Sequence, residues 1–344
     1  MLPFRIELQA AELEALLREQ GFGAAAFVPS SALPPAISRH PEIAALGEGT
    51  FLITALSCHR EEPEDLSEPG DPHALIAPFA RRNYYAEAVV RLKSVVRALR
   101  NTCGFSKQAL RIFCNSRLPE KALAVLSGLG SYGKNTLILI PGMGSLFVIA
   151  GLFVPATVIG NSSPRLTTDQ AGAADPRFSL CGSCRACQDA CPADALSEAG
   201  RLDDSRCLQA LCTEPLQFSE SHRRAWAFRL YGCQSCQDVC PYNRNPGAET
   251  ATRRGELGPS LSLKHLLSLS PEQFKECIRG SALARSWIPP RTLLRNALLA
   301  AGNRRDPVLR DLVAGHVSSL DPLVAQAAAW ALTRIGDAAP GAQT

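Results

Sequence analysis

Two cysteine-rich stretches decide the fold of this chain: residues 180–195, LCGSCRACQDACPADA, and residues 230–243, LYGCQSCQDVCPYN. The first contains the run Cys-x2-Cys-x2-Cys-x3-Cys-Pro, and the second contains Cys-x2-Cys-x3-Cys-Pro. The first run has the spacing found in bacterial ferredoxins, where a tight loop supplies three soft thiolates to a four-iron–four-sulfur cluster. The pair of motifs therefore predicts two such clusters and single-electron transfer.

The two motifs hold seven cysteines, one fewer than two cubane clusters need. In two-cluster proteins the fourth cysteine of a run ligates the other cluster. This crossover rule predicts two ligand sets: Cys181, Cys184, Cys187 and Cys240 for cluster A, and Cys191, Cys233 and Cys236 for cluster B. The ligand missing from cluster B lies between the motifs, and either Cys207 or Cys212 could supply it.

Composition excludes several other classes of protein. The chain has 344 residues, 46% of them hydrophobic and 20% charged, with a formal net charge of +4, as in an ordinary soluble globular protein. No basic region followed by an apolar run opens the sequence, so we expect no export signal. Without export the cysteines should be reduced and free to bind metal. Paired zinc sites also use Cys-x2-Cys, but x2-x2-x3 followed by proline is not zinc-finger spacing.

The longest apolar stretch, residues 136–159, is interrupted by Pro141, Gly142 and Gly144. It is too broken for a transmembrane helix, so we expect two buried strands around a turn and no membrane partner.

The chain divides into three expected domains. Residues 1–160 alternate helical and extended patterns, which predicts an α/β domain. Residues 161–250 carry the cysteine motifs behind a Ser/Thr/Asp/Gly/Pro-rich linker. Residues 251–344 become rich in Ala and Leu after Pro289, and helices of about a dozen residues favour a HEAT-type repeat. In the first domain we expect helices at 8–20, 84–100 and 118–128, strands at 22–28, 50–56 and 110–114, and a loop at 60–75.

Both cysteine stretches, together with LPEKALAVLSGLGSYGKNTLILIPGMGS at 118–145 and RTLLRNALLAAGN at 291–303, resemble the epoxyqueuosine reductase family. The resemblance runs in the same order from about residue 80 to 336. It implies a cytoplasmic, monomeric enzyme that reduces the epoxide of epoxyqueuosine at the wobble position of tRNA. It also implies a cobalamin-binding-like N-terminal domain, a ferredoxin-like domain with two four-iron–four-sulfur clusters fed by an external electron donor, and a HEAT-like helical tail that helps to hold tRNA.

The resemblance also assigns residues. In the family the cysteine of an Arg-Cys pair completes the second cluster, which implies Cys207 rather than Cys212. The remaining implied positions concern cobalamin: Lys134 in the Gly-Lys-Asn turn beside it, Ile138 and Ile149 lining the corrin, and Gln209, Gln234 and Ser235 near it. For Ile138 and Ile149, plain strand core is an equally good interpretation.

One departure from the family concerns its catalytic aspartate, which is thought to protonate the substrate. Here Cys114 occupies the aligned position and Asn115 follows it. A thiol can donate a proton, whereas an asparagine cannot act as an acid. The departure leaves three possibilities: Cys114 is the donor, Glu120 has taken over the role, or the reaction differs in a divergent paralogue.

Basic residues recur where a polyanion could bind, or where they form only a solvated face. They are Arg81, Arg82, Arg91, Lys93, Arg97 and Arg100, then Arg223, Arg224 and Arg229, and finally Arg291, Arg295, Arg304, Arg305 and Arg310.

Three alternative functions remain open from the sequence: an epoxyqueuosine-reductase-like enzyme acting on tRNA, a cobalamin and iron–sulfur reductase with another substrate, or a non-catalytic two-cluster electron-transfer protein.

Overall fold

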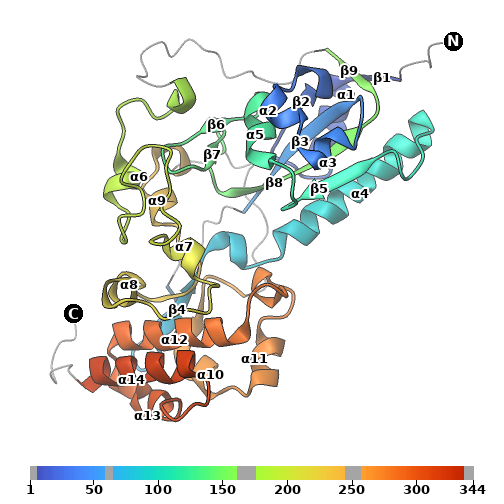
Figure 1. Cartoon of the computed structure of the whole chain (residues 1–344). Helices are drawn as coiled ribbons and strands as arrows, with labels where there is room; N and C mark the ends of the chain where they lie inside the picture. Colours follow the sequence, from blue (N-terminus) through green and yellow to red (C-terminus); the bar gives the residue numbers. More distant parts are fainter. Residues whose placement is uncertain (1–5, 59–64, 161–175, 245–256, 337–344) are drawn as a thin grey trace.

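The computed structural model describes residues 6–58, 65–160, 176–244 and 257–336 (Figure 1). An N-terminal α/β part lies beside the cysteine-bearing loops, and both stand above a layer of C-terminal helices. The N-terminal elements are β1 Glu7–Gln9, α1 Ala10–Glu19, β2 Ala24–Pro29, α2 Pro35–Ser38, α3 Pro41–Ala44, β3 Thr50–Ser57, β4 His73–Ile76, α4 Tyr84–Cys103, β5 Arg111–Cys114, α5 Glu120–Leu126, β6 Ser131–Tyr132, β7 Ile138–Leu139, β8 Phe147–Val154 and β9 Thr157–Ile159.

The main sheet has the strand order β2-β3-β8-β5, and every neighbouring pair in it is antiparallel. All eight residues of β3 are buried because both faces of the sheet are covered. Leu52 and Leu56 belong to the hydrophobic cluster that includes α1 and α4 residues, whereas Phe51 and Ile53 belong to the cluster that includes α5 residues. This two-sided burial explains why β3 and β8 read as nearly continuous apolar runs.

The helices and strands expected before residue 130 are confirmed, with ends shifted by a few residues. Helix α4 begins where the side chain of Asn83 accepts a hydrogen bond from Ala86 N. It ends at Gly104, which takes the left-handed conformation common after a helix. The stretch 136–159 contains the two expected strands, β7 and β8. They pair with different partners, β7 with β6 and β8 with β3 and β5.

The prediction of a loop at 60–75 is wrong at its C-terminal end, because strand β4 begins at His73. Residues 59–64 lie outside the described residues. Strand β4 pairs in parallel with β10, Arg229–Tyr231, and antiparallel with β11, Ser260–Ser262. Its partners come from positions far along the chain, so the local Pro- and Asp-rich composition gives no sign of the strand. This small sheet joins all three expected domains.

The cysteine-bearing part contains short elements only: α6 Ala186–Asp189, α7 Leu208–Leu211, α8 Glu220–Ala225, β10 and α9 Ser235–Asp238. Most of the Ser/Thr/Asp/Gly/Pro-rich linker expected before the first cysteine motif, residues 161–175, lies outside the described residues. Helices α6 and α9 are the α-helices of the two cysteine motifs and contact each other. The fold here is thus set by loops, as expected for a region organised around thiol ligands.

The C-terminal part is helical: α10 Leu263–Ser268, α11 Pro271–Cys277, α12 Pro290–Arg304, α13 Arg310–Ala314 and α14 Pro322–Gly336. Helix α12 is buried along most of its length and packs against α14. Gly302 permits this close packing, since a Cβ there would lie 2.7 Å from the Trp330 ring. In the described ranges, no helix is both long enough and apolar enough to cross a lipid bilayer.

Candidate active site

Cysteines of the two motifs and of the segment between them line two cavities. The first cavity, about 190 Å³, is lined by four cysteines that we call group A: Cys181, Cys184, Cys187 and Cys240. The second, about 410 Å³, is lined by Cys58, which follows β3, and by four cysteines that we call group B: Cys191, Cys207, Cys233 and Cys236. Each group combines cysteines from both motifs, as the crossover rule requires. Among the described residues, no three His, Cys, Asp or Glu side chains form a site for a single metal ion.

The acidities of the thiols reflect the same grouping. Burial chiefly raises the pKa of Cys187 to about 11, and the neighbouring group A thiols raise it further. Burial likewise raises the pKa of Cys236 to about 12, with further contributions from Cys233, from Cys187 of group A, and from Cys207 and Cys191. Burial and the neighbouring thiols therefore keep Cys187 and Cys236 protonated at neutral pH, whereas a bound cation would favour their thiolate forms.

The structure also separates the two cysteines that lie between the motifs. Cys207 caps the start of α7 and lines the larger cavity. Cys212 is buried, its Sγ donates to the carbonyl of Gln209, and it is not among the cavity-lining residues. Burial raises the pKa of Cys212 to about 12, as is typical of an inert core thiol.

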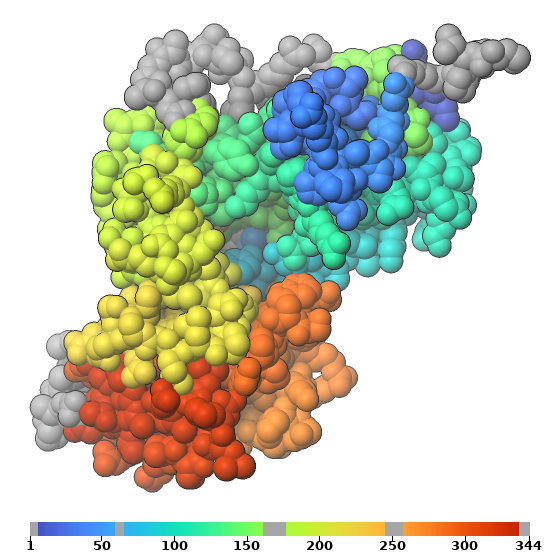
Figure 2. Space-filling view, viewed as in Figure 1, coloured from blue at the N-terminus to red at the C-terminus, as the bar shows by residue number. Residues whose placement is uncertain are grey.

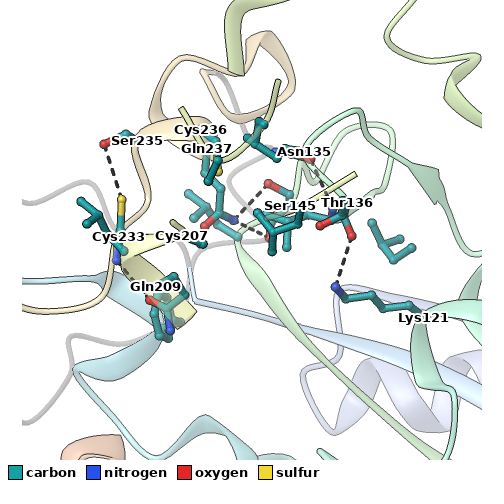
Figure 3. Close-up of a pocket in the computed structure, with 18 of the residues that line it drawn as sticks. Lys121, Asn135, Thr136, Ser145, Cys207, Gln209, Cys233, Ser235, Cys236 and Gln237 are labelled. Carbon is teal, nitrogen blue, oxygen red and sulfur yellow. Dashed lines mark hydrogen bonds between the residues drawn. The ribbon is translucent and has the colours of Figure 1, made fainter. Parts of the chain in front are cut away.

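The larger cavity lies where the N-terminal part faces the cysteine loops, in the hollow near the centre of Figure 2. One wall is apolar and comes from β7, β8 and the turn between them, including Ile138, Val148 and Ile149. The opposite wall carries the group B thiols, with Gln209 and Ser235 beside them (Figure 3). An apolar wall facing a few placed polar groups is the usual form of a cofactor site.

A carboxyl group closes one side of this cavity. The carboxylate of Glu120, at the start of α5, accepts hydrogen bonds from Asn115 N at 3.1 Å, Ser116 N at 2.8 Å and Ser116 Oγ at 2.8 Å. Burial raises the pKa of Glu120, although the hydrogen bonds from Ser116 act in the opposite direction. The neighbouring Lys121 also lines the cavity, and its Nζ donates to Thr136 O at 3.2 Å.

Three residues implied by the resemblance do not line the larger cavity. Cys114 lies on β5 and its Sγ donates to the carbonyl of Ile149 at 3.4 Å, while burial raises its pKa to about 12. Lys134 lines the group A cavity, and its Nζ donates to Gly182 O at 2.7 Å and Cys184 O at 2.8 Å. Gln234 lines a smaller cavity behind the second motif. Ile138, Ile149, Gln209 and Ser235 do line the larger cavity.

A buried polar network joins the N-terminal part to the second motif. The side chain of Gln237 donates to Ser145 O at 3.0 Å and to Ser145 Oγ at 3.1 Å. The side chain of Asn243 donates to Ser145 Oγ at 3.1 Å and to Gln237 O at 2.8 Å. Sequence reasoning missed both residues, although each lies within the quoted stretch 230–243.

A further cavity of about 370 Å³ shares Tyr85, Asn115 and Gln209 with the larger one and extends toward the C-terminal part. There it is lined by Trp287, whose side chain is 47% exposed. The Arg285 guanidinium lies 4.7 Å from the centre of the Trp287 ring. The periodicity of the sequence gave no signal for Trp287, because its relation to the site depends on how the C-terminal part packs.

Several basic residues proposed for a polyanion have internal roles instead. Arg81 and Arg295 are buried, and their side chains donate to backbone carbonyls. Arg304 donates to Asp65 at 2.6 Å, and Arg91 pairs with Glu87. Exposed side chains remain at Lys93, Arg97, Arg100, Arg224, Arg291, Arg305 and Arg310.

Comparison with known proteins agrees with the motifs. Residues 180–243 match the family described as a 4Fe-4S double cluster binding domain. The chain is 32% identical over 228 residues to an epoxyqueuosine reductase of Listeria monocytogenes, covering 64% of this chain and 55% of that protein. It is 36% identical over 234 residues to that of Pseudomonas aeruginosa, covering 63% and 58%. The chain thus spans little more than half the length of these curated relatives.

The fold extends further than the sequence match. A structure of epoxyqueuosine reductase from Streptococcus thermophilus superposes with a TM-score of 0.79 at 22% identity, covering 96% of this chain and 91% of that one. A structure of epoxyqueuosine reductase with an epoxyqueuosine-modified tRNA stem loop gives a TM-score of 0.75 at 22% identity, covering 95% and 90%. The resemblance predicted from the motifs is therefore confirmed.

Proposed function

We propose that this chain, a relative of the epoxyqueuosine reductases, is an iron–sulfur reductase that removes the epoxide oxygen of epoxyqueuosine in tRNA. The observation that carries the proposal is the lining of one cavity: all four group B thiols face the same space as an apolar wall and the half-buried carboxyl group of Glu120. Conversion of an epoxide to an alkene consumes two electrons and two protons and releases the oxygen as water, so we propose that electrons reach the epoxide carbon from the group B side and that the Glu120 carboxyl protonates the leaving oxygen, with the second proton coming from solvent.

The cysteine groups supply the ligands. Group A would hold one four-iron–four-sulfur cluster and group B the other, with Cys207 completing group B. The donor set fits, because each cavity is lined by at least four thiols, the number that one cubane cluster needs; Cys58 also lines the larger cavity, but it comes from the end of β3 and not from the cysteine loops. Cys184 of group A is exposed, so we propose that an external electron donor delivers electrons there. Group B then faces the reacting centre.

The apolar wall fits a cobalamin. Ile138, Val148 and Ile149 would contact the corrin face, and Gln209 and Ser235 would lie near it. When bound, such a group supplies a metal centre able to reduce an electrophilic carbon. The protein's own contribution is to shield this space from water on the β7 and β8 side and to expose it on the substrate side.

We propose Glu120, not Cys114, as the acid. The Cys114 thiol is committed to the carbonyl of Ile149 and its pKa lies near 12, so it is a poor proton donor. The Glu120 carboxyl lines the cavity, and burial favours its protonated form. The amide and hydroxyl groups of Asn115 and Ser116 fix its position and can stabilise the carboxylate after it has given up its proton.

The substrate would enter through the 370 Å³ cavity. A nucleobase can stack on an exposed indole, and the Arg285 guanidinium next to Trp287 can meet a phosphate. Exposed Arg291, Arg305 and Arg310 of the helical part, which we propose to be HEAT-like, would contact the tRNA backbone. We further propose a cytoplasmic monomer with domains at 1–160, 161–250 and 251–344.

The decisive test is reduction of epoxyqueuosine in tRNA by anaerobically reconstituted protein, read out as queuosine by nucleoside mass spectrometry. The same readout in a strain lacking the gene, with and without the wild-type copy, tests the activity in cells. We expect queuosine to appear only with loaded protein, and tRNA affinity to fall with salt by about 0.7–0.9 decades per phosphate contact per decade. Unchanged queuosine in the deletion strain would contradict the substrate.

A second candidate is a reductase with the same cofactors and another substrate. This candidate is favoured by the replacement of the family's catalytic aspartate by Cys114. The Cys114 thiol, on β5, donates to the carbonyl of Ile149 on β8 and does not line the larger cavity. Screening the reconstituted protein against epoxides that are not attached to tRNA separates the two, because only the first candidate requires the nucleic acid.

A further inference from the structure

One group B cysteine, Cys233, has polar contacts at both its backbone and its sulfur (Figure 3). Its backbone N donates to Gln209 Oε1 at 3.1 Å. Its Sγ lies 3.8 Å from Ser235 Oγ, within hydrogen-bonding range for sulfur. Gln209 and Ser235 both line the larger cavity, but each also has a direct contact with this cysteine.

An arginine fixes the serine. Arg229 Nη2 donates to Ser235 Oγ at 2.8 Å. Its Nη1 donates to the carbonyls of Trp226 at 2.9 Å and Ala225 at 3.1 Å, at the end of α8. The guanidinium is planar and always protonated, so it can only donate to the serine oxygen.

This arrangement determines the direction of the serine hydroxyl. A hydroxyl has one proton to donate, and its oxygen here is already an acceptor for Arg229. When Cys233 is a thiolate, its sulfur has no proton and can only accept. The Ser235 proton is therefore free to point at the Cys233 sulfur. Another group B sulfur, that of Cys191, accepts from Ala195 N at 3.2 Å.

We propose that Arg229 and Ser235 are positioning residues that direct a hydroxyl hydrogen bond onto the Cys233 thiolate and so make cluster B easier to reduce. Reduction adds negative charge to the cluster and its sulfurs, and a hydrogen bond to a ligating sulfur stabilises that charge. The inference rests on the cluster-binding part of the proposed function and does not depend on the substrate.

The test compares Ser235→Ala and Ser235→Thr in reconstituted holoprotein. Potentials are read by redox titration followed by electron paramagnetic resonance, and a Cys207→Ser sample identifies the signal of cluster A alone. We expect Ser235→Ala to lower the reduction equilibrium constant of cluster B three- to tenfold, a shift of about 30–59 mV for one electron. Ser235→Thr keeps the hydroxyl and should stay close to wild type.

A spectroscopic readout separates this role from a merely structural one. Electron–nuclear double resonance of reduced wild-type protein should show, besides the coupling of the Ala195 amide proton, a further solvent-exchangeable proton coupled to cluster B; this further coupling should be retained in Ser235→Thr and lost in Ser235→Ala. Arg229→Met should shift the potential in the same direction by a smaller amount. The matched control is Arg185→Met, which removes an exposed arginine inside the first motif, between the group A cysteines Cys184 and Cys187, that is paired with Asp189.

The outcomes are distinguishable. Full iron content in Ser235→Ala, with the potential and the proton coupling of wild type, overturns the inference and leaves the proposed function intact. Wild-type protein that takes up no iron at group B overturns both, and iron and sulfide analysis identifies this case before any potential is measured.

Discussion

The side-chain oxygen of Asn243 accepts a hydrogen bond from Ser145 N at 2.7 Å, across 98 positions of sequence. Asn243 follows the second cysteine motif, whereas Ser145 lies in the turn before β8. Both residues are buried, so this bond and those of Gln237 replace water around the turn. We call these buried hydrogen bonds of Ser145 with Asn243 and Gln237 the joint. The joint holds the cysteine loops against the sheet and thereby sets the distance between the group B thiols and the apolar wall of the cavity.

A substitution at Gly144 tests this joint, because an added side chain there would meet Asn243. The φ of Gly144 is +75°, and an added Cβ would lie 2.0 Å from Asn243 Oδ1 and 2.7 Å from the carbonyl of Tyr242. Gly142 also has a φ of +75°, but a Cβ there meets nothing within 4 Å. Gly142→Ala should cost about 1–2 kcal/mol from backbone strain. Gly144→Ala should cost a further ~1–3 kcal/mol because the asparagine must move. Equal losses for the two variants in chemical denaturation would contradict the joint.

Replacing the cysteines between the motifs should have different effects on metal content. Cys207→Ser should lower bound iron from about eight to about four atoms per chain, because cluster B loses a ligand. Cys212→Ser should retain about eight atoms and lower stability only, since this thiol is buried away from the cavity. Iron and sulfide analysis after anaerobic reconstitution decides the matter. Loss of iron in Cys212→Ser alone would reverse the assignment.

Glu120→Gln should abolish most of the activity by removing the proton donor, a loss of about 10²–10⁴-fold in rate. Glu120→Asp should recover part of it. In the wild type the rate should decline as pH rises through the pKa of Glu120, which burial raises. A pH–rate profile of substrate reduction measures this alkaline decline. Full activity in Glu120→Gln would exclude the carboxyl as the donor.

The same shift has a consequence for stability. Because the folded state raises the pKa of Glu120, folding is favoured by its protonation, and this stability is complete below the unfolded value of about 4.3. It declines as pH rises through the folded pKa. Glu120→Gln remains neutral, so its stability relative to the wild type should improve as pH increases across this window. Urea denaturation of both proteins at a series of pH values measures their free energies of unfolding. If the two free energies changed with pH in parallel, the pKa of Glu120 would not be raised by folding.

Arg295 should be essential for the position of Cys207. Its guanidinium donates to the carbonyls of Glu214 at 2.7 Å and Cys212 at 3.0 Å, in the segment that follows α7. Arg295→Met removes the donor to the carbonyls of Glu214 and Leu216, whereas the carbonyl of Cys212 still accepts from Asn296 Nδ2 at 3.1 Å, and the loss should destabilise the protein by about 1–3 kcal/mol. Arg97→Met, at an exposed position of α4, should change stability by no more than about 0.5 kcal/mol. Similar midpoints of thermal unfolding for both variants would contradict this role.

Much of the site could be predicted from sequence, because the cysteine ligands are local. The spacing within Cys181–Cys191 is set by the reach of one tight loop, so it can be read directly. The crossover of Cys191 and Cys240 follows from the same local geometry in two-cluster proteins. The number of cysteines alone could not decide between Cys207 and Cys212 as the missing ligand. The structure distinguishes them, because Cys212 is buried against α12 whereas Cys207 lines the larger cavity.

The positions of Lys134, Cys114 and β4 depended on contacts between distant segments. A lysine in a turn carries no sign of which loop its ammonium group will reach, and here it reaches the carbonyls of Gly182 and Cys184. A strand end such as Cys114 faces one side or the other according to the pairing of β5 with β8. The amino-acid sequence alone indicated which thiols are candidate iron ligands, because thiolate chemistry and loop length are local properties. Only the packing of the sheet, the cysteine loops and the C-terminal helices decided which carboxyl, amide and aromatic groups lie around the group B thiols.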